Sequence, residues 1–142
     1  MNTPLRPITS SSARLLHTML RVRNLDASLA FYIGHLGMRL LRWRDFTEQR
    51  FTLAFVGYGD ESNAAVIELT HNWDKDRYVP GDAFGHIAIA VDDVHATVAR
   101  LAPEGVTVTR PAGPLVGDPS ETIAFIADPD GYRIELIERP AP

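Results

Sequence analysis

The chain contains the stretch FGHIAIAVDD at residues 84–93 and, earlier, the similar stretch LLHTMLRV at residues 15–22. Each begins as an apolar segment of strand length that carries one histidine near its start. Each strand segment is followed by a turn rich in Asp and Asn, NLD at 24–26 and DDV at 92–94, and such turns commonly cap a helix. The same order of elements therefore begins twice in the chain.

The rest of the sequence continues this internal repeat. The predicted helices, residues 26–36 and 93–102, each end near a glycine, Gly37 or Gly105. Each half then closes on an acidic apolar segment, AVIEL at 65–69 and RIELI at 133–137. The two histidines are 69 residues apart (86 − 17), and the two glutamates of these segments are 67 apart (135 − 68). A near-constant offset indicates a repeated module.

We therefore predict an α+β fold of two tandem βαβββ modules with curved mixed sheets. A single domain at 14–142 would comprise a module at 14–70, a linker at 71–83 and a module at 84–138. Residues 1–13 have little apolar content and are predicted to be a flexible N-terminal tail. The Pro- and Gly-rich segment 111–120, PAGPLVGDPS, is predicted to be a flexible loop suited to act as a lid. The expected strands are 14–22, 38–46, 50–58, 63–70, 84–91, 106–110, 121–127 and 132–138.

Composition excludes several classes of function. The chain has 142 residues and a formal net charge of −4, so its bulk electrostatics do not suggest binding to nucleic acid. No apolar run is long enough to span a membrane. The chain has no cysteine, which rules out disulfides, thiolate nucleophiles and thiolate-bound metal, and fits a reducing cytoplasm, where we expect the protein to act.

Four polar residues occupy repeat-related positions on these apolar strands: His17, Glu68, His86 and Glu135. Side chains alternate across a strand, so each of the four lies opposite a face of core residues. If the modules pack with pseudo-symmetry, the four faces would line one concave, metal-binding surface. Two imidazoles and two carboxylates suit a divalent nickel, cobalt, zinc, manganese or iron ion. Taken singly, a strand histidine is more often a hydrogen-bonded structural residue and a strand glutamate more often faces solvent.

Four motifs resemble glyoxalase I, a member of the vicinal oxygen chelate superfamily. They are RLLHTMLRVRNLDASLAFY at 14–32, LAFVGYGDESNAAVIELTHNW at 53–73, FGHIAIAVDD at 84–93 and IAFIADPDGYRIELIE at 123–138. The resemblance implies paired βαβββ modules, a homodimer with active sites shared between subunits, and His17, Glu68, His86 and Glu135 as ligands of one divalent metal per site. The chain is similar to the short bacterial type, which implies nickel or cobalt, with zinc as the alternative.

The resemblance also implies an activity, the isomerisation of the methylglyoxal–glutathione hemithioacetal to S-lactoylglutathione. A proton moves from C1 to C2 through an enediolate, whose negative charge a metal stabilises. Glu135 is implied as the main base, and Glu68 as the base for the other enantiomer or for the hydroxyl proton. Arg21 and Asn72 match positions that bind the γ-glutamyl end of glutathione; otherwise they would be a surface arginine and a turn asparagine. Relatives often place a lysine in the loop after Gly-Pro, whereas GPLVG at 113–117 has none.

Other functions of the superfamily are the alternatives. By resemblance, ring-cleaving dioxygenases and thiol transferases bind their metal through two histidines and one carboxylate. The four candidate protein ligands of this chain argue against both. The epimerases have an amide where this chain has Glu68. A metal-free small-molecule-binding protein would not need two acidic strand residues directed into a cavity, and the absence of divalent metal from the purified protein would favour it.

Overall fold

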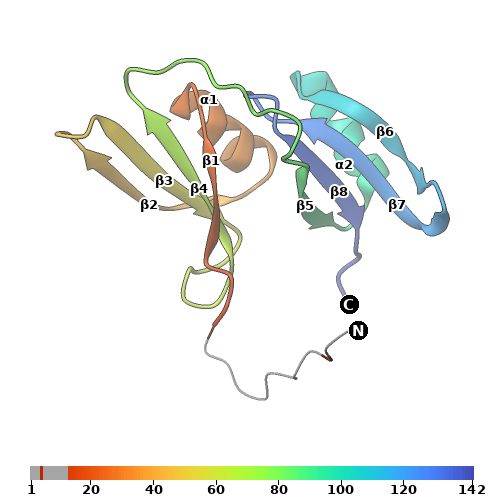
Figure 1. Cartoon of the computed structure of the whole chain (residues 1–142). Helices are drawn as coiled ribbons and strands as arrows, with labels where there is room; N and C mark the ends of the chain where they lie inside the picture. The colour runs from red at the N-terminus through yellow and green to blue at the C-terminus, as the bar shows by residue number, and fades with distance from the viewer. Residues whose placement is uncertain (1–3, 5–12) are drawn as a thin grey trace.

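The computed structural model describes Pro4 and residues 13–142. The predicted N-terminal tail, residues 1–13, therefore lies outside the described residues apart from Pro4 and Ala13. The chain forms two four-stranded sheets of equivalent topology, each with its own helical segment (Figure 1). In Figure 1 the segment after β4 passes above the first module and descends into β5 at the edge of the second sheet.

The first module contains four strands and one helical segment. Its elements are β1 (His17–Arg21), α1 (Leu25–Leu29), the π-helix η1 (Ala30–His35), β2 (Arg39–Phe46), β3 (Phe51–Gly57) and β4 (Val66–Asn72). The sheet order is β1-β4-β3-β2. The pair β1–β4 is parallel and the other two pairs are antiparallel, so the sheet is mixed.

The second module repeats this plan. Its elements are β5 (His86–Val91), α2 (Val94–Leu101), the 3₁₀ helix η2 (Ala102–Glu104), β6 (Thr107–Leu115), β7 (Asp118–Ala127) and β8 (Arg133–Glu138). The order β5-β8-β7-β6, with β5 parallel to β8, matches the first sheet strand for strand. The predicted α+β fold of two tandem βαβββ units is confirmed. No helix in the described part of the chain is long and apolar enough to cross a membrane.

Both helical segments begin and end as their sequences predict. The Asn24 side chain accepts a hydrogen bond from Ala27 N, and the Asp93 side chain accepts one from Ala96 N, so both Asx residues are N-caps. Gly37 and Gly105 follow the helical segments with φ values of 74° and 91°, a left-handed conformation that glycine adopts without a Cβ clash.

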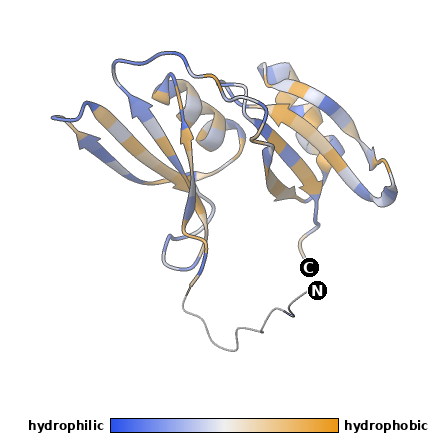
Figure 2. Cartoon of the chain, in the orientation of Figure 1, coloured by the Kyte–Doolittle hydropathy of each residue, from blue (hydrophilic) through white to orange (hydrophobic). Residues whose placement is uncertain are grey.

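The core lies between each sheet and its helical segment. Ile67 and Leu69 of β4 and Ile134 and Leu136 of β8 belong to one buried cluster that spans both modules. The residue between each pair, Glu68 or Glu135, is directed to the opposite face of its sheet because strand side chains alternate. Figure 2 shows the resulting bands of hydrophilic and hydrophobic residues along the strands.

The two modules are joined by a hydrogen-bond network centred on a buried bond between Tyr32 and Asp128. The hydroxyl of Tyr32, in η1, donates to Asp128 Oδ2 at 2.7 Å. Asp128 Oδ1 accepts from the backbone N–H groups of Asp130 and Tyr132, at 2.9 and 2.8 Å. Tyr132 in turn donates its hydroxyl to the Arg21 carbonyl at 2.8 Å. The turn between β7 and β8 is thereby held against both η1 and the end of β1.

The predicted loop at 111–120 is wrong. Residues 111–115 and 118–120 lie in the strands of the β6–β7 hairpin, with register shifts between Arg110 and Gly113 and between Pro114 and Leu115. Proline and glycine weaken ordinary ladder pairing, but the guanidinium of Arg110 donates to the carbonyls of Pro111, Gly113, Pro114 and Ile123 at 2.6–3.1 Å. The arginine therefore supplies donors to carbonyls in the stretch where the ladder is irregular.

Candidate metal centre

The first two candidate ligands form a pair in the first module. His17 opens β1 and Glu68 lies within β4, and the parallel register sets Met19 beside Glu68. His17 Nε2 lies 2.8 Å from Glu68 Oε2. The glutamate side chain is 14% exposed and the histidine side chain 34%, so the carboxylate is largely shielded while the imidazole is reachable. We call His17 and Glu68 the first half-site.

The other two candidates form the equivalent pair in the second module. His86 opens β5, and Ala88 lies beside Glu135 of β8 in the same parallel register. His86 Nε2 lies 3.3 Å from Glu135 Oε1, and the side chains are 38% and 16% exposed. We call His86 and Glu135 the second half-site. Its exposure pattern is nearly the same as that of the first.

An aromatic ring supports each histidine. The Phe55 ring lies edge-on to His17 with centroids 5.5 Å apart, and the Phe125 ring lies edge-on to His86 at 5.1 Å. Phe55 is the cross-strand neighbour of Glu68, and Phe125 that of Glu135. Strand alternation and the separation of 70 residues (125 − 55) are the sequence signals that place both rings on the half-site faces.

A cation covers the far face of each ring. The Arg42 guanidinium lies 3.6 Å from the Phe55 centroid and forms a bidentate pair with Glu61. The Arg133 guanidinium lies 4.4 Å from the Phe125 centroid. Cation–π stacking restrains both rings, and through them the imidazole planes.

One chain does not bring the four residues together. Within the part of the chain that the structure describes, no three His, Asp or Glu side chains converge on a point where a metal ion could be held. The single concave surface expected for pseudo-symmetric packing is therefore not formed by one chain alone. What one chain provides is two separate half-sites, each with one imidazole and one carboxylate.

Comparison with known protein families decides the class. The sequence model of the Glyoxalase/Bleomycin resistance protein/Dioxygenase superfamily matches residues 14–136, both modules included. The chain belongs to this superfamily.

Individual relatives show which members of the superfamily the chain is similar to. A protein from Neisseria meningitidis serogroup A named lactoylglutathione lyase is 57% identical over 126 residues, covering 89% of this chain and 91% of its own length. The crystal structure of glyoxalase I from Zea mays is 43% identical with a TM-score of 0.86; it covers 90% of this chain, which spans only 45% of the maize chain. The Leishmania major glyoxalase I, described as trypanothione-dependent, is 45% identical with a TM-score of 0.81, covering 89% of this chain and 87% of its own. These similarities confirm the predicted enzyme class.

The superfamily implies a divalent metal, and the half-sites fit one. Each offers an imidazole nitrogen and a carboxylate oxygen that already face each other at hydrogen-bonding distance. In the described structure neither Glu68 nor Glu135 makes another side-chain hydrogen bond or ion pair. Such a donor set suits borderline divalent ions such as nickel, cobalt and zinc.

Arg21 and Asn72, which the resemblance assigns to substrate binding, lie further along β1 and β4 than the first half-site. Arg21 ends β1 on the same face as His17, and its guanidinium makes no hydrogen bond or ion pair with the described residues. Asn72 ends β4 and donates from Nδ2 to the Tyr78 hydroxyl at 2.9 Å. Sequence reasoning missed Thr70, which lies between Glu68 and Asn72 on that face of β4 and beside Arg21 in the register. Its buried hydroxyl has no partner in the described structure, which leaves a hydrogen-bonding position for a ligand or water.

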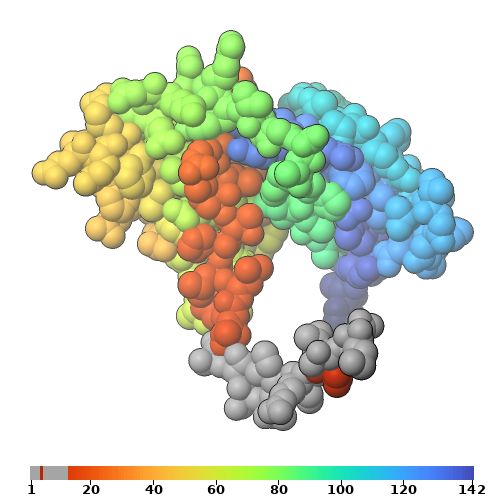
Figure 3. Space-filling model, viewed as in Figure 1, coloured from red at the N-terminus to blue at the C-terminus, as the bar shows by residue number. Residues whose placement is uncertain are grey.

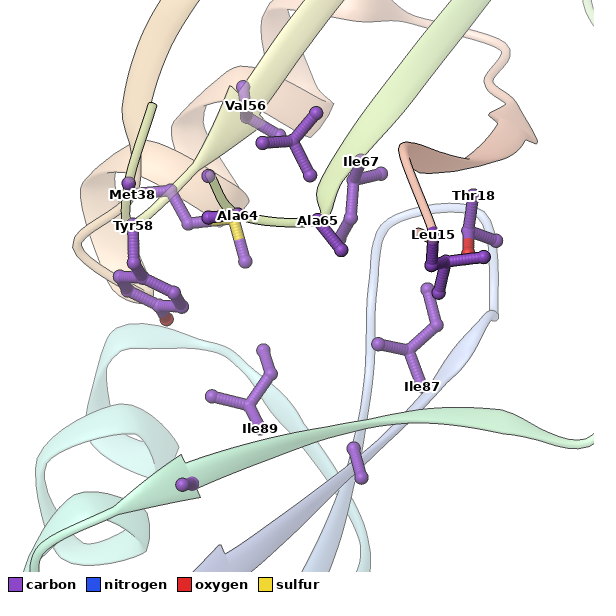
Figure 4. Close-up of a pocket in the computed structure, with 15 residues that line it drawn as sticks. Leu15, Thr18, Met38, Val56, Tyr58, Ala64, Ala65, Ile67, Ile87 and Ile89 are labelled. Atoms are coloured by element: carbon purple, nitrogen blue, oxygen red, sulfur yellow. The ribbon is translucent and has the colours of Figure 1, made fainter. Parts of the chain in front are cut away.

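A separate cavity of about 440 Å³ lies where the two modules meet. Ile87 and Ile89 of β5 point into it toward Leu15, Ile67 and Met38 (Figure 4). Its walls are mostly apolar, and none of the four candidate ligands lines it. This cavity is therefore not where the polar chemistry of the half-sites takes place.

Proposed function

We propose that this chain is a glyoxalase I that converts the hemithioacetal of methylglyoxal and glutathione into S-lactoylglutathione. The observation that carries the proposal is the pair of repeat-related half-sites, each with an imidazole and a shielded carboxylate 2.8 or 3.3 Å apart. Relatives named lactoylglutathione lyase, which match about nine-tenths of the chain, support the same reaction.

We propose that His17, Glu68, His86 and Glu135 together hold one divalent ion per site. Since one chain keeps its half-sites apart, the first half-site of one subunit would meet the second half-site of another, giving a homodimer with two equivalent sites. When bound, the ion would supply Lewis-acid stabilisation of the negative charge that develops on the substrate oxygens.

The carboxylates would carry the proton. Glu135 removes the proton from C1 of the hemithioacetal and returns it to C2, which converts the hydroxy carbon and the neighbouring carbonyl into a hydroxyacyl thioester. Glu68 occupies the repeat-related position and serves the other enantiomer or moves the hydroxyl proton. Low exposure of both carboxylates, 14% and 16%, limits competition from water for the substrate proton.

Arg21 and Asn72 would anchor the tripeptide. Both lie on the half-site side of adjacent strands, Arg21 at the end of β1 and Asn72 at the end of β4. The guanidinium supplies charge-assisted donors for a carboxylate, and the amide of Asn72 retains its carbonyl oxygen for an ammonium group.

Thioester formation from methylglyoxal and glutathione tests the activity directly. The protein is stripped of metal, reconstituted separately with nickel, cobalt or zinc, and assayed by the absorbance of the thioester. We expect activity with nickel and cobalt to exceed that with zinc, as the short bacterial type implies. No thioester with any of the three metals would overturn the proposed reaction, and higher activity with zinc would overturn the metal preference alone.

A further inference from the structure

A second chamber, of about 550 Å³, lies next to the first half-site. Its lining includes Met19, Arg21, Lys75, Tyr78, Phe84 and Tyr132, and we call it the cationic chamber. Met19 and Arg21 share the β1 face that bears His17, so the chamber continues the surface of the half-site along the strand. In the space-filling view the segment after β4, which forms one wall, covers the upper end of the first module (Figure 3).

Hydrogen bonds fix the chamber walls in place. Lys75 N donates to the Asn72 carbonyl at 3.1 Å, which folds the chain into a turn directly after β4. Asn72 Nδ2 binds the Tyr78 hydroxyl at 2.9 Å, and the Lys75 ammonium lies 4.8 Å from the centroid of the Tyr78 ring. On the opposite wall Tyr132 is tied to the Arg21 carbonyl at 2.8 Å. Lys75 is therefore held beside the chamber by a tyrosine that is itself anchored.

The charge of the chamber is unbalanced. No carboxylate lines it, although Asp74 and Asp76 flank Lys75 in sequence. Asp74 is engaged by Arg50 through two contacts of 2.7 Å, and Asp76 lines a neighbouring cavity. In the described residues neither Arg21 nor Lys75 has a carboxylate partner. Two cations that face one cavity without a counter-charge favour an anionic ligand.

Hydrogen-bond acceptors also lie beside the chamber, on Tyr78 of its lining and on two residues that adjoin the lining, Thr70 and Asn72. The Thr70 hydroxyl is buried and unpartnered, and Thr70 is the register neighbour of Arg21. The Tyr78 hydroxyl and the carbonyl oxygen of Asn72 add two further acceptors close to Lys75. A ligand group with both a carboxylate and an ammonium would match cations and acceptors together, whereas a carboxylate alone would use only the cations.

The distance from the half-site to Arg21 suits a carboxylate and ammonium at the end of a tripeptide. Arg21 lies four residues along β1 from His17, or roughly 13 Å at the usual rise of a strand. An extended tripeptide spans roughly 10 Å. We propose that Lys75, together with Arg21, binds the α-carboxylate of the γ-glutamyl end of the thiol substrate. This inference rests on the proposed function and adds Lys75 to the residues that set affinity for the thiol.

Equilibrium binding of S-methylglutathione, an unreactive thioether, tests Lys75 without relying on turnover. With the metal-loaded protein, Lys75→Gln should weaken binding by about five- to tenfold, and Lys75→Arg should restore most of it. In the activity assay KM for the hemithioacetal should rise by a similar factor with little change in kcat. The matched control is Arg77→Gln, which removes the same charge two residues away from a wall of the neighbouring cavity and should change neither value.

Two altered ligands identify which end of the tripeptide Lys75 binds. S-methyl-N-acetylcysteinylglycine lacks the γ-glutamyl group, and the Lys75→Gln effect should disappear with it. The glycyl ethyl ester of S-methylglutathione keeps the γ-glutamyl group, and the effect should persist. The reverse pattern, equal binding by wild type and Lys75→Gln, or no binding of S-methylglutathione by the wild type would overturn the inference. A failure of the proposed reaction is read separately, from thioester formation by the wild type.

Discussion

His17 and His86 each direct Nε2 at a carboxylate oxygen, at 2.8 and 3.3 Å, and each ring rests edge-on against a phenylalanine. Each imidazole is thereby held by a polar contact on one side and an aromatic contact on another. Pre-oriented ligands lose less conformational freedom when an ion binds, which raises affinity. The half-sites therefore have the local order that a metal centre needs before the ion arrives.

The four proposed metal ligands give the first prediction. Glu68→Gln and His86→Ala should each lower metal content and activity together, because each removes one of the four proposed donors. We expect the loss in metal affinity to be on the order of 100-fold or more. Metal per subunit is measured by elemental analysis beside the thioester assay. The control Glu121→Gln, whose carboxylate pairs with Arg139 and makes no ion pair with a half-site residue, should keep both values. Full metal occupancy in both ligand variants would refute the assignment.

At the scale of elements, the repeat allowed the order β-α-β-β-β, the capping turns at 24–26 and 92–94 and the helix-ending glycines to be predicted, and the structure identifies Asn24 and Asp93 as the caps within those turns. These features depend on local periodicity and on capping chemistry, which a sequence records directly. The β6–β7 hairpin could not be predicted in this way. Its Pro and Gly content is typical of a loop, and its irregular strand pairing is supported by a side-chain contact, the Arg110 guanidinium against carbonyls on both strands.

The second prediction follows from that contact. Arg110→Met keeps the length of the side chain but removes every donor, so the carbonyls of Gly113, Pro114 and Ile123 lose their partner. Amide hydrogen exchange in residues 112–122 should become at least about tenfold faster, while exchange in β8 stays unchanged. Arg50→Met, which removes a surface arginine paired with Asp74 in the first module, is the control. Unchanged protection of the hairpin in Arg110→Met would show that strand pairing alone holds it.

The contact between η1 and the turn after β7 gives the third prediction. Tyr32→Phe removes the hydroxyl that Asp128 Oδ2 accepts at 2.7 Å, and leaves a buried carboxylate oxygen short of a partner. We expect the free energy of unfolding at pH 7 to fall by about 1–3 kcal/mol. Denaturant unfolding measures the change. Tyr78→Phe, a less buried tyrosine whose hydroxyl accepts from Asn72, provides a comparison with an expected loss below about 1 kcal/mol. An equal loss in the two variants would argue against a special role for the buried pair.

The same tyrosine should also shape stability at high pH. Burial, then the charge of Asp128, raise the pKa of Tyr32 well above its ordinary value of 10.0. Below pH 10 both the folded and unfolded states keep the phenolic proton, so Tyr32 contributes no pH dependence. Above pH 10 only the unfolded state loses it, and the free energy of unfolding should fall by up to about 1.4 kcal/mol per pH unit.

This component is absent from Tyr32→Phe. The difference in free energy of unfolding between wild type and variant should therefore narrow as the pH rises beyond 10. Tyr58 and Tyr132 are present in both proteins and cancel. A gap that stays constant with pH would mean that Tyr32 ionises in the folded state as readily as in the unfolded one.

At the scale of the whole molecule, the arrangement of the modules decides what one chain can do. Strand alternation predicts which face of a sheet carries Glu68 or Glu135, but it carries no information on how the two sheets are oriented. That orientation is set by tertiary contacts such as the Tyr32–Asp128 bond and the Arg23–Asp130 pair. Strand alternation therefore supports the identity of the four candidate residues, and the family resemblance implies their division between subunits. The structure adds the two pairs within one chain, His17 with Glu68 and His86 with Glu135.

The last prediction tests how the half-sites are completed. His17→Ala and Glu135→Ala are each expected to be inactive as homodimers, because every shared site would lack one ligand. After subunit exchange a heterodimer would contain one site with both defects and one with none. Random mixing of equal amounts yields about half heterodimer, and so about a quarter of the wild-type sites. Activity should therefore rise from near zero to roughly one quarter of the wild-type value once the subunits exchange.

Subunit exchange is verified with a mass-tagged subunit, and the control mixes His17→Ala with Glu68→Ala. These two defects lie in the same half-site, so every shared site keeps one of them and activity should not return. Failure of the first mixture after proven exchange, or an active monomer at low concentration, would instead require one chain to bring all four ligands together by moving its modules.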